Sequence, residues 1–302
     1  MTEPAEPLPR RAVLHGILGA AALALLACGS AVSAAPATLD DAVGQLLDRL
    51  DPDGPYRHPT PAERDRAVAA ADRLAFIDTT TATAEAFAPL DMNVSAATDP
   101  ATGRRYALAA SRPDTDRSWG ILALDLTTSP PDLLVEVPHP GSDRHTERLG
   151  LALFRALPGA ALLIAGAHRR AAEGAADVAH QPDTMFHAVA THLADRGATQ
   201  LQLHGFHDDS LADHDIVVSA GAGTSTQYTE QIADALSNVD FDVCRAWTQR
   251  CGSLEGRTNA QGRAAAVHGY PFLHLEINRS TRDDHERSAT LIHTIANRYR
   301  SM

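Results

Sequence analysis

The sequence has no lysine, so all 26 of its basic side chains are arginines. The chain therefore cannot use a lysine nucleophile, a lysine Schiff base or a phosphate-binding lysine of the Walker type. Positive charge is scarce beside the 38 acidic residues, and the net charge of −12 argues against a protein that binds nucleic acid. Aromatic residues make up only 5% of the 302 residues, but a hydrophobic content of 44% is ordinary for a globular chain and excludes wholesale disorder.

Long hydrophobic runs are missing except near the N-terminus, where residues 1–35 resemble an export signal. Arg10 and Arg11 precede the apolar run Leu14–Ala27, and small residues suited to signal cleavage end at Ala34. The arginine pair is similar to a twin-arginine signal. We therefore expect an exported bacterial protein that is secreted or held at the cell surface.

A lipid anchor is the one membrane attachment that the sequence suggests. Residues 25–28 resemble a bacterial lipobox, in which Cys28 would carry the lipid. Cleavage after Ala34 would instead remove Cys28 together with the signal. The sequence leaves both outcomes open.

Only two cysteines follow the signal, Cys244 and Cys251. In an oxidising compartment they could close a small loop as a disulfide. Two neighbouring cysteines in an exported protein argue against a nucleophilic cysteine, which is usually a single free thiol near a base.

The remaining residues, 36–302, are expected to form a single α/β domain of the hydrolase type. Strand-like and helix-like segments alternate from residue 150 onward, which predicts a mixed, largely parallel central sheet with helices on both faces. An earlier cluster of strands predicts an antiparallel extension of that sheet, and residues 36–90 form a helical N-terminal extension. Helices are predicted at 39–50, 60–74, 148–157, 184–196, 229–238 and 282–300, and strands at 93–98, 105–111, 119–126, 133–137, 161–165, 199–204, 216–219 and 272–278.

The loop after the predicted strand 133–137 contains side chains that bind metals. It carries His139, Asp143, His145 and Glu147 within nine residues of one another. Histidine and carboxylate ligands on a short loop can hold zinc. The same residues also fit a polar loop that caps the helix after it.

The predicted strand 199–204 has one polar face. Leu201 and Leu203 point to one side, so Gln202 and His204 point to the other, with His204 at the strand end. Ligands in such sheets bind at the carboxyl ends of the strands. His204 is therefore a candidate ligand, whereas the acidic, histidine-containing loop after it also fits a solvated loop.

The predicted strand 272–278 alternates in the same way, with His274, Glu276 and Asn278 on one face. A carboxylate on a central strand needs a partner, because burying an unpaired charge is costly. A metal-activated water or an arginine would meet that need, and a structural ion pair is the alternative.

Two arginines follow the predicted strand 161–165. Arg169 and Arg170 come directly after His168, and Asp177 and His180 follow a short loop. Guanidinium groups bind carboxylates in a bidentate manner, so one arginine is a candidate for a substrate carboxylate. Both could equally be surface arginines.

Four segments in this order resemble motifs of a known family: Val137–Gly141, His168–Arg170 leading to Asp177–His180, Gln202–Gly205, and Glu276–Ser280. The family is the zinc amidohydrolase and carboxypeptidase superfamily, and the resemblance is closest to the N-formylglutamate amidohydrolases. It covers about residues 133–282. The last motif is the most specific.

The resemblance implies a zinc site. His139 and His204 would be ligands, with Asp143 or else Glu147 as the third protein ligand beside a water. Further candidates for the site are His145, His168, His180, Asn278 and Arg279.

The resemblance also implies catalytic roles. Glu276 would act as general base and later as general acid on the water at the zinc. Arg169 or Arg170 would stabilise the oxyanion or bind a substrate carboxylate.

The sequence departs from this family at two places. The Asn-Arg pair that binds the substrate carboxylate in the family is replaced by Ala179 and His180, and Gln202 stands where an acid is usual. We therefore expect an exported zinc-dependent hydrolase of an amide bond in a peptide, an acyl-amino acid or a poly-glutamate. The departures and the histidine-rich loop 204–215 leave open a non-catalytic exported protein that binds a metal or a ligand on the same fold.

Overall fold

The structure is a computed structural model that describes residues 1–2, 38–75 and 80–301. From residue 38 onward, the described residues belong to one compact unit, Ser33–Met302. The predicted export signal, including Cys28, lies outside the described residues apart from Met1 and Thr2. Among the described helices, none combines the length and the apolar character needed to cross a membrane.

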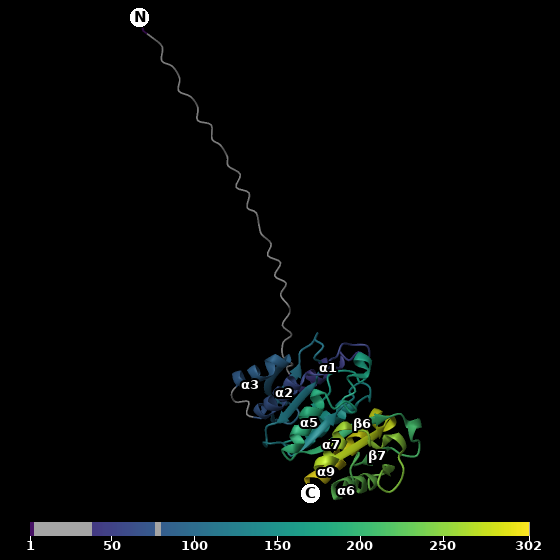
Figure 1. Cartoon of the computed structure of the whole chain (residues 1–302). Coiled ribbons are helices and arrows are strands. Elements are labelled where there is room, and N and C mark those ends of the chain that lie inside the picture. The colour runs from purple at the N-terminus through teal and green to yellow at the C-terminus, as the bar shows by residue number, and fades with distance from the viewer. Residues whose placement is uncertain (3–37, 76–79, 302) are drawn as a thin grey trace. The chain divides into compact units, whose positions relative to one another are not determined.

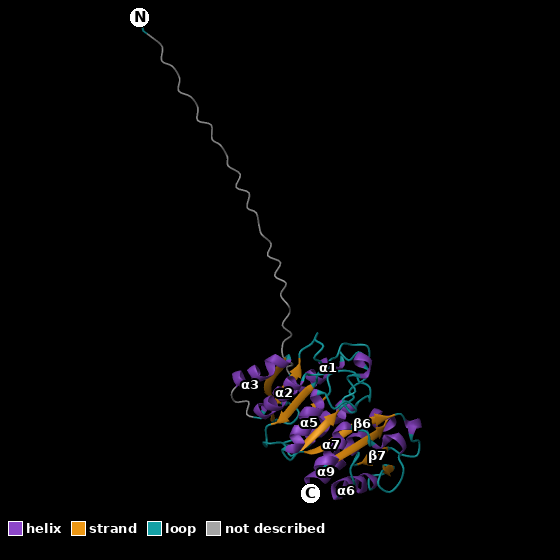
Figure 2. Cartoon of the chain, viewed as in Figure 1, coloured by secondary structure: helices purple, strands orange, loops and turns teal. Residues whose placement is uncertain are grey.

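Within the described residues, nine strands form one sheet in the order β1-β2-β3-β5-β4-β6-β9-β7-β8. Figure 1 and Figure 2 show strands and helices of this part of the chain, with β6 and β7 labelled. The strands are β1 (Met92–Thr98), β2 (Arg105–Ser111), β3 (Ile121–Asp125), β4 (Leu133–Val137), β5 (Ala161–Ile164), β6 (Thr199–Phe206), β7 (Ile216–Ser219), β8 (Val243–Arg245) and β9 (Phe272–Asn278).

Parallel pairing dominates the centre of the sheet. Three neighbouring pairs are parallel, namely β5–β4, β4–β6 and β6–β9. Three pairs on one side of them are antiparallel, namely β1–β2, β2–β3 and β3–β5. Strand β7 runs antiparallel to β9 and parallel to β8. The mixed, largely parallel sheet predicted from the sequence is confirmed, and so is its antiparallel extension.

Helices cover both faces of the sheet (Figure 2). The helices are α1 (Leu39–Leu47), α2 (Pro61–Leu74), α3 (Thr80–Phe87), α4 (Thr146–Ala156), α5 (Met185–Asp195), α6 (Gln227–Ser237), α7 (Ala260–His268), α8 (Arg279–Asp283) and α9 (His285–Arg300). Short 3₁₀ helices lie at η1 (Ala88–Leu90), η2 (Ala171–Gly174), η3 (Asp208–Ser210) and η4 (Gly252–Glu255).

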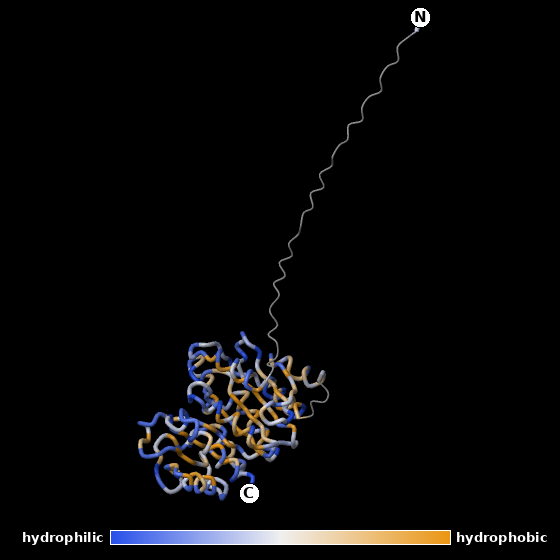
Figure 3. The backbone as a smooth tube through the Cα atoms, turned by 180° about the vertical axis from the view of Figure 1, so that it is seen from behind, coloured by the Kyte–Doolittle hydropathy of each residue, from blue (hydrophilic) through white to orange (hydrophobic). Residues whose placement is uncertain are grey.

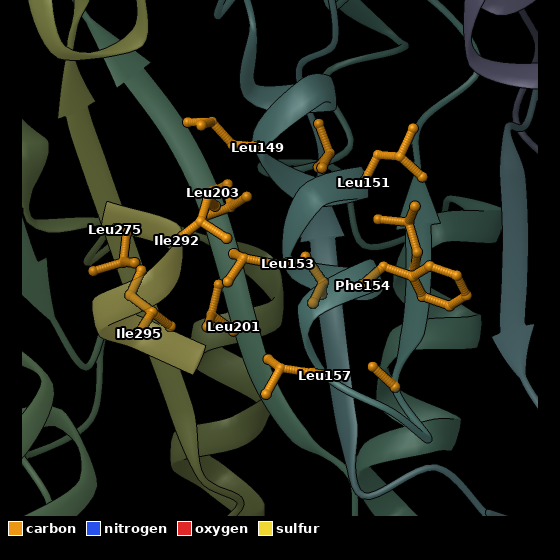
Figure 4. Close-up of a cluster of buried hydrophobic side chains, with 14 of the residues drawn as sticks. Leu149, Leu151, Leu153, Phe154, Leu157, Leu201, Leu203, Leu275, Ile292 and Ile295 are labelled. Carbon is orange, nitrogen blue, oxygen red and sulfur yellow. The ribbon is translucent and has the colours of Figure 1, made fainter. Parts of the chain in front are cut away.

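Each face of the sheet has its own apolar core. The first core joins the leucine face of β6 and β9 to α1, α4, α6 and α9, as the side chains of Leu153, Leu201 and Ile295 in Figure 4 illustrate. The second joins Leu134 of β4 to α2 and α5. Figure 3 shows hydrophobic segments inside the folded part and hydrophilic ones along its outer loops. Each large apolar side chain that folding buries stabilises the fold by about 1.5–3 kcal/mol.

Local signals explain where the best-predicted elements begin. Helix α2 starts with the predicted capping box, in which Thr60 accepts from the backbone of Glu63 and the Glu63 carboxylate accepts from Thr60. The predicted helix 282–300 is instead two helices, because the side chain of Asp284 accepts from the backbone of Glu286 and Arg287 and so begins α9. Helices α3 and α7 and the three-residue strand β8 were not predicted from the sequence.

Cys244 on β8 and Cys251 form a disulfide, as the sequence predicted. Both sulfur-bearing side chains are buried, and they pack against Val217 of the neighbouring strand β7 in a small apolar cluster. The bridge thus ties the loop after β8 to the edge of the sheet.

Candidate metal centre

The polar side chains that the sequence singled out gather at one edge of the sheet. Strands β5, β4, β6 and β9 are adjacent and parallel, so their carboxyl ends meet there. His139 follows β4, His204 lies near the end of β6, and Glu276 lies near the end of β9. Residues far apart in the sequence therefore converge because of the strand order.

Strand register aligns these side chains on one face. Gln202 of β6 pairs with Glu136 of β4 on one side and with His274 of β9 on the other. One step closer to the carboxyl edge, His204 pairs with Glu276. The leucines between them face the first apolar core. The alternation predicted for both strands is confirmed.

Three buried ligand atoms lie close together at this edge. Oδ2 of Asp143 is 3.2 Å from Nδ1 of His139 and 3.4 Å from Nδ1 of His204. Zinc bonds of about 2.0–2.1 Å in a tetrahedral arrangement separate neighbouring ligand atoms by about 3.3–3.4 Å. Two imidazoles and one carboxylate are also a donor set that zinc accepts. The residues present therefore fit a zinc ion in both spacing and chemistry.

Hydrogen bonds on the far sides of both histidines direct Nδ1 towards this site. Nε2 of His139 lies 2.8 Å from a carboxylate oxygen of Asp177, and Nε2 of His204 lies 2.7 Å from Oε1 of Gln202. Carboxylate and amide oxygens only accept hydrogen bonds, so each Nε2 carries a hydrogen, and each Nδ1, which faces Asp143, would have to give up any hydrogen to hold a metal. Such partners fix the tautomer and the ring orientation of metal-binding histidines.

Asp177 and Asp143 are both ionised beside the histidines. Burial alone would raise the pKa of each carboxyl, but hydrogen bonds to neighbouring histidines hold both pKa values well below the usual range. Asp143 interacts with His139 and His204, and it also accepts a hydrogen bond from the backbone of Gly205 at 3.2 Å. Both carboxylates are therefore charged acceptors.

A buried network orients the amide of Gln202. Its Nε2 donates to Glu136 at 2.6 Å and to Gln261 at 3.2 Å, which turns its Oε1 towards His204 and Asn259. Burial raises the pKa of Glu136 to about 8, against the smaller effect of the hydrogen bond from Gln202. The amide of Gln202 on β6 thus contacts Nε2 of His204, and the carboxyl of Glu136 on β4 contacts that amide from the other side.

Arg169 is held next to the ligands. One of its nitrogens donates to Asp177 at 2.7 Å, and another lies 3.3 Å from Nδ1 of His139. Arg170 is exposed and lines an open hollow of about 540 Å³ with Asp53, Glu173 and Asp177. Arg169 also lines this hollow, so both arginines border it, but only Arg169 contacts Asp177 and His139.

Glu276 lies beside the three candidate ligands, and its carboxyl group makes no hydrogen bond or ion pair with any described residue. Its carboxylate lies within 4.8 Å of ligand atoms of His204 and His274. Burial raises its pKa well above the usual value, and the charge of Asp143 adds to this, while Arg282 and Arg169 oppose it. The carboxyl of Glu276 therefore holds a proton more readily than an exposed glutamate does.

His274 and His180 add two further imidazoles. His274 is 2% exposed, its Nδ1 has no hydrogen-bond partner, and its ring centre is 4.6 Å from that of His204. Burial lowers its pKa well below the usual value. His180 is half-exposed, with Nδ1 at 3.1 Å from Asp177. The ligand atoms of His139, Asp177 and His180 also lie within 4.8 Å of one another.

Two loop candidates lie outside the three-ligand group. Glu147 is in the first turn of α4, where it accepts from the backbone of Gly141 at 3.5 Å. His145 precedes that helix and lies 3.3 Å from Asp283. Of the two proposed third ligands, the structure thus brings Asp143 to the histidines.

The remaining candidates make local contacts. Asn278 caps α8 by accepting from the backbone of Thr281, and Arg279 pairs with Asp283 at 3.2 Å. His168 is half-buried, and its Nδ1 accepts from the backbone of Arg170. His168 lies in none of the described groups of metal-binding side chains.

Arg282 is not among the candidates that the sequence indicates, because it falls in a segment predicted as the start of a packing helix. Its guanidinium is buried against Gly205 and donates to the backbone carbonyls of Ile277, Phe206 and Arg144. It therefore joins the ends of β6 and β9 to the loop that carries Asp143. No signal in the sequence links Asp177 to His139, although Asp177 follows Arg169 by eight residues.

Comparison with known proteins gives a weak likeness to several metalloenzyme structures. No protein-family model matches the chain, and no curated protein matches it. The zinc-free apo form of YNDL is 13% identical with a TM-score of 0.39, covering 70% of this chain and 91% of that one. A candidate carboxypeptidase A from Shewanella denitrificans is 17% identical with a TM-score of 0.38, covering 82% and 69%. An aspartoacylase family protein from Mesorhizobium loti is 12% identical with a TM-score of 0.37, covering 68% of each chain. Scores this low do not establish a family.

Proposed function

We propose that the protein is an exported zinc-dependent hydrolase of an amide bond, with His139, Asp143 and His204 as the zinc ligands. The observation that carries the proposal is the spacing of their three buried ligand atoms, with the free carboxyl of Glu276 beside them. The motif resemblance in the sequence points to the same residues. Export rests on the N-terminal signal in the sequence alone.

The chain's own residues suit hydrolysis. A zinc ion at the three ligands would supply a Lewis acid that polarises the amide carbonyl and a water molecule. Glu276 accepts the proton of the attacking water and returns it to the leaving amine. Arg169, fixed by Asp177, provides positive charge where the carbonyl oxygen becomes negative.

The hollow next to Arg169 supports a peptide-like or acyl-amino acid substrate. Arg170 at its rim makes no side-chain ion pair with any described residue, so it is free to bind a substrate carboxylate. Asp53 and Glu173 line the same hollow and would favour a substrate that also carries an amino group.

Two variants test the proposal on purified protein without a histidine tag. In Glu276→Gln we expect about one zinc per chain by elemental analysis, with amide hydrolysis of dipeptides and N-acyl-amino acids reduced at least ~100-fold. In His204→Ala we expect zinc to be lost, and His207→Ala, on the exposed loop after β6, is the matched control. Zinc that stays bound in His204→Ala, or full turnover by Glu276→Gln, would refute the mechanism.

A non-catalytic metal-binding protein is the second candidate. His180 stands where the family resemblance has an arginine, and His274 and His180 extend the ligand groups beyond a single zinc site. This alternative predicts metal binding without hydrolysis of any amide in the panel, by the wild type as well as by Glu276→Gln.

A further inference from the structure

A separate pocket of about 250 Å³ lies between helices α4 and α9. Its lining contains none of the proposed zinc ligands. Its apolar wall is made of two side chains of α4 and two of α9, namely Leu149, Ala152, Ala289 and Ile292. Figure 4 shows Leu149 and Ile292 on these two helices. A wall of this kind holds the apolar part of a ligand.

The polar lining of the pocket contains basic side chains and no acidic one. It consists of two arginines, three histidines and a serine, namely Arg148, Arg282, His145, His285, His293 and Ser288, with no aspartate or glutamate. This selection stands out in a chain with a net charge of −12. His145 has two acidic neighbours outside the lining, Asp283 at 3.3 Å and Glu147 at 4.0 Å.

Three of these five basic side chains have no partner among the described residues. The side chains of Arg148, His285 and His293 make no hydrogen bond or ion pair with any described residue. Solvent-exposed arginines without partners are common, so these groups alone identify no ligand. They do leave donors free at the mouth of the pocket.

Arg282 supplies the second, independent observation. It is 6% exposed, and its guanidinium donates to three backbone carbonyls but forms no ion pair with any described carboxylate. A guanidinium has five N–H donors, so some remain. Asp143, Asp283 and Glu276 stabilise its charge without forming an ion pair, so an anion in the pocket would be a direct partner for it.

We propose that this pocket binds a small amphipathic anion, a carboxylate on a short apolar chain. The apolar wall takes the chain, and Arg148 with the histidines of α9 takes the carboxylate. A volume near the lower end for ligand pockets suits a chain of about six to eight carbons. The proposal does not depend on the proposed hydrolase function.

Calorimetric titration of the purified protein with octanoate tests the proposal, with octan-1-ol and octylamine as matched probes. We expect one octanoate per chain at this site and at least ~10-fold weaker binding of both uncharged and cationic probes. Arg148→Ala should weaken octanoate binding at least ~10-fold, and Ala289→Phe should abolish it by filling the pocket. Arg66→Ala, an exposed arginine of α2, is the control and should bind as the wild type does.

The zinc site could also bind a carboxylate, and His204→Ala separates the two sites. Binding that survives in His204→Ala and is lost in Arg148→Ala supports the pocket, whatever the enzyme assay shows. Octanoate binding that is lost in His204→Ala but unchanged in Arg148→Ala and Ala289→Phe would overturn the proposal, as would equal binding of octan-1-ol.

Discussion

Gln202 has an unusual position for a neutral residue. It lies behind a candidate zinc ligand, with its amide oxygen 2.7 Å from Nε2 of His204 and its amide nitrogen 2.6 Å from the buried carboxyl of Glu136. A neutral acceptor fixes the imidazole as a carboxylate would, but it adds no negative charge behind the ring. The acid stands one strand further away, on β4.

Replacing this amide should weaken metal binding. In Gln202→Leu the imidazole of His204 loses the acceptor that holds its tautomer, so we expect zinc affinity to fall about 10–100-fold. Competition with a fluorescent chelator measures the affinity without any substrate. Gln261→Leu, which removes a neighbour of Gln202 but leaves the bond to His204, should change it much less. Wild-type affinity in Gln202→Leu would show that the contact does not orient the ligand.

Some single residues of the site can be predicted from the sequence, and others cannot. His204 and Glu276 could be found because alternation places them on the polar face of strands whose other face is leucine-rich. The choice between Asp143 and Glu147 could not be made, since both follow His139 on one loop and only the loop's path decides which carboxylate turns inward. Asp177 is 38 residues from His139, and no local pattern links the two.

At the scale of elements, helix α2 begins with a capping box that is reinforced by an arginine. The Glu63 carboxylate accepts from the backbone of Thr60 at 2.8 Å and from Arg57 at 2.7 and 2.9 Å. The hydrogen bonds from Arg57 are the main cause that lowers the pKa of Glu63 to about 2, against the effect of burial. The ionised form is therefore favoured in the folded chain.

This contact predicts a pH-dependent contribution to stability. Glu63→Gln should lower the free energy of unfolding by about 1 kcal/mol at neutral pH. The folded-state pKa is below the unfolded value near 4.3, so the stabilisation is complete above about pH 4.3 and is lost as the pH falls towards 2. Urea unfolding at pH 7, 4 and 3 measures the difference in unfolding free energy between the wild type and Glu63→Gln. This difference should become smaller as the pH falls. Glu85→Gln, on exposed α3, is the control, and a difference that grows on acidification would contradict the prediction.

At the scale of the whole molecule, one sheet is shared between two apolar cores. Successive residues of β4 alternate between them, with Leu134 in the second core and Val135 in the first. The same strands contribute side chains to both cores, so loss of packing in one core disrupts strands that the other core needs. We therefore expect the two faces to unfold together.

A substitution in either core should shift the same transition. Leu153→Ala on α4 and Leu193→Ala on α5 should each lower the free energy of unfolding by about 2–5 kcal/mol, because each leaves a cavity in a packed interior. Urea unfolding followed by far-ultraviolet circular dichroism and by tryptophan fluorescence measures this. Val267→Ala, whose side chain is 81% exposed, should have little effect. Two separate transitions, with each variant moving only one, would show independent halves.

The sequence by itself determined the local structure and the candidates. Period-two alternation in 199–204 and 272–278 and the capping box of α2 depend only on neighbouring residues, so they can be read without the fold. The tertiary structure decided the strand order, the antiparallel insertion of β7 between β9 and β8, and the meeting of His139, Asp143 and His204. These depend on how the connections cross and pack between distant strands, and contacts over such separations leave no periodic mark in the chain.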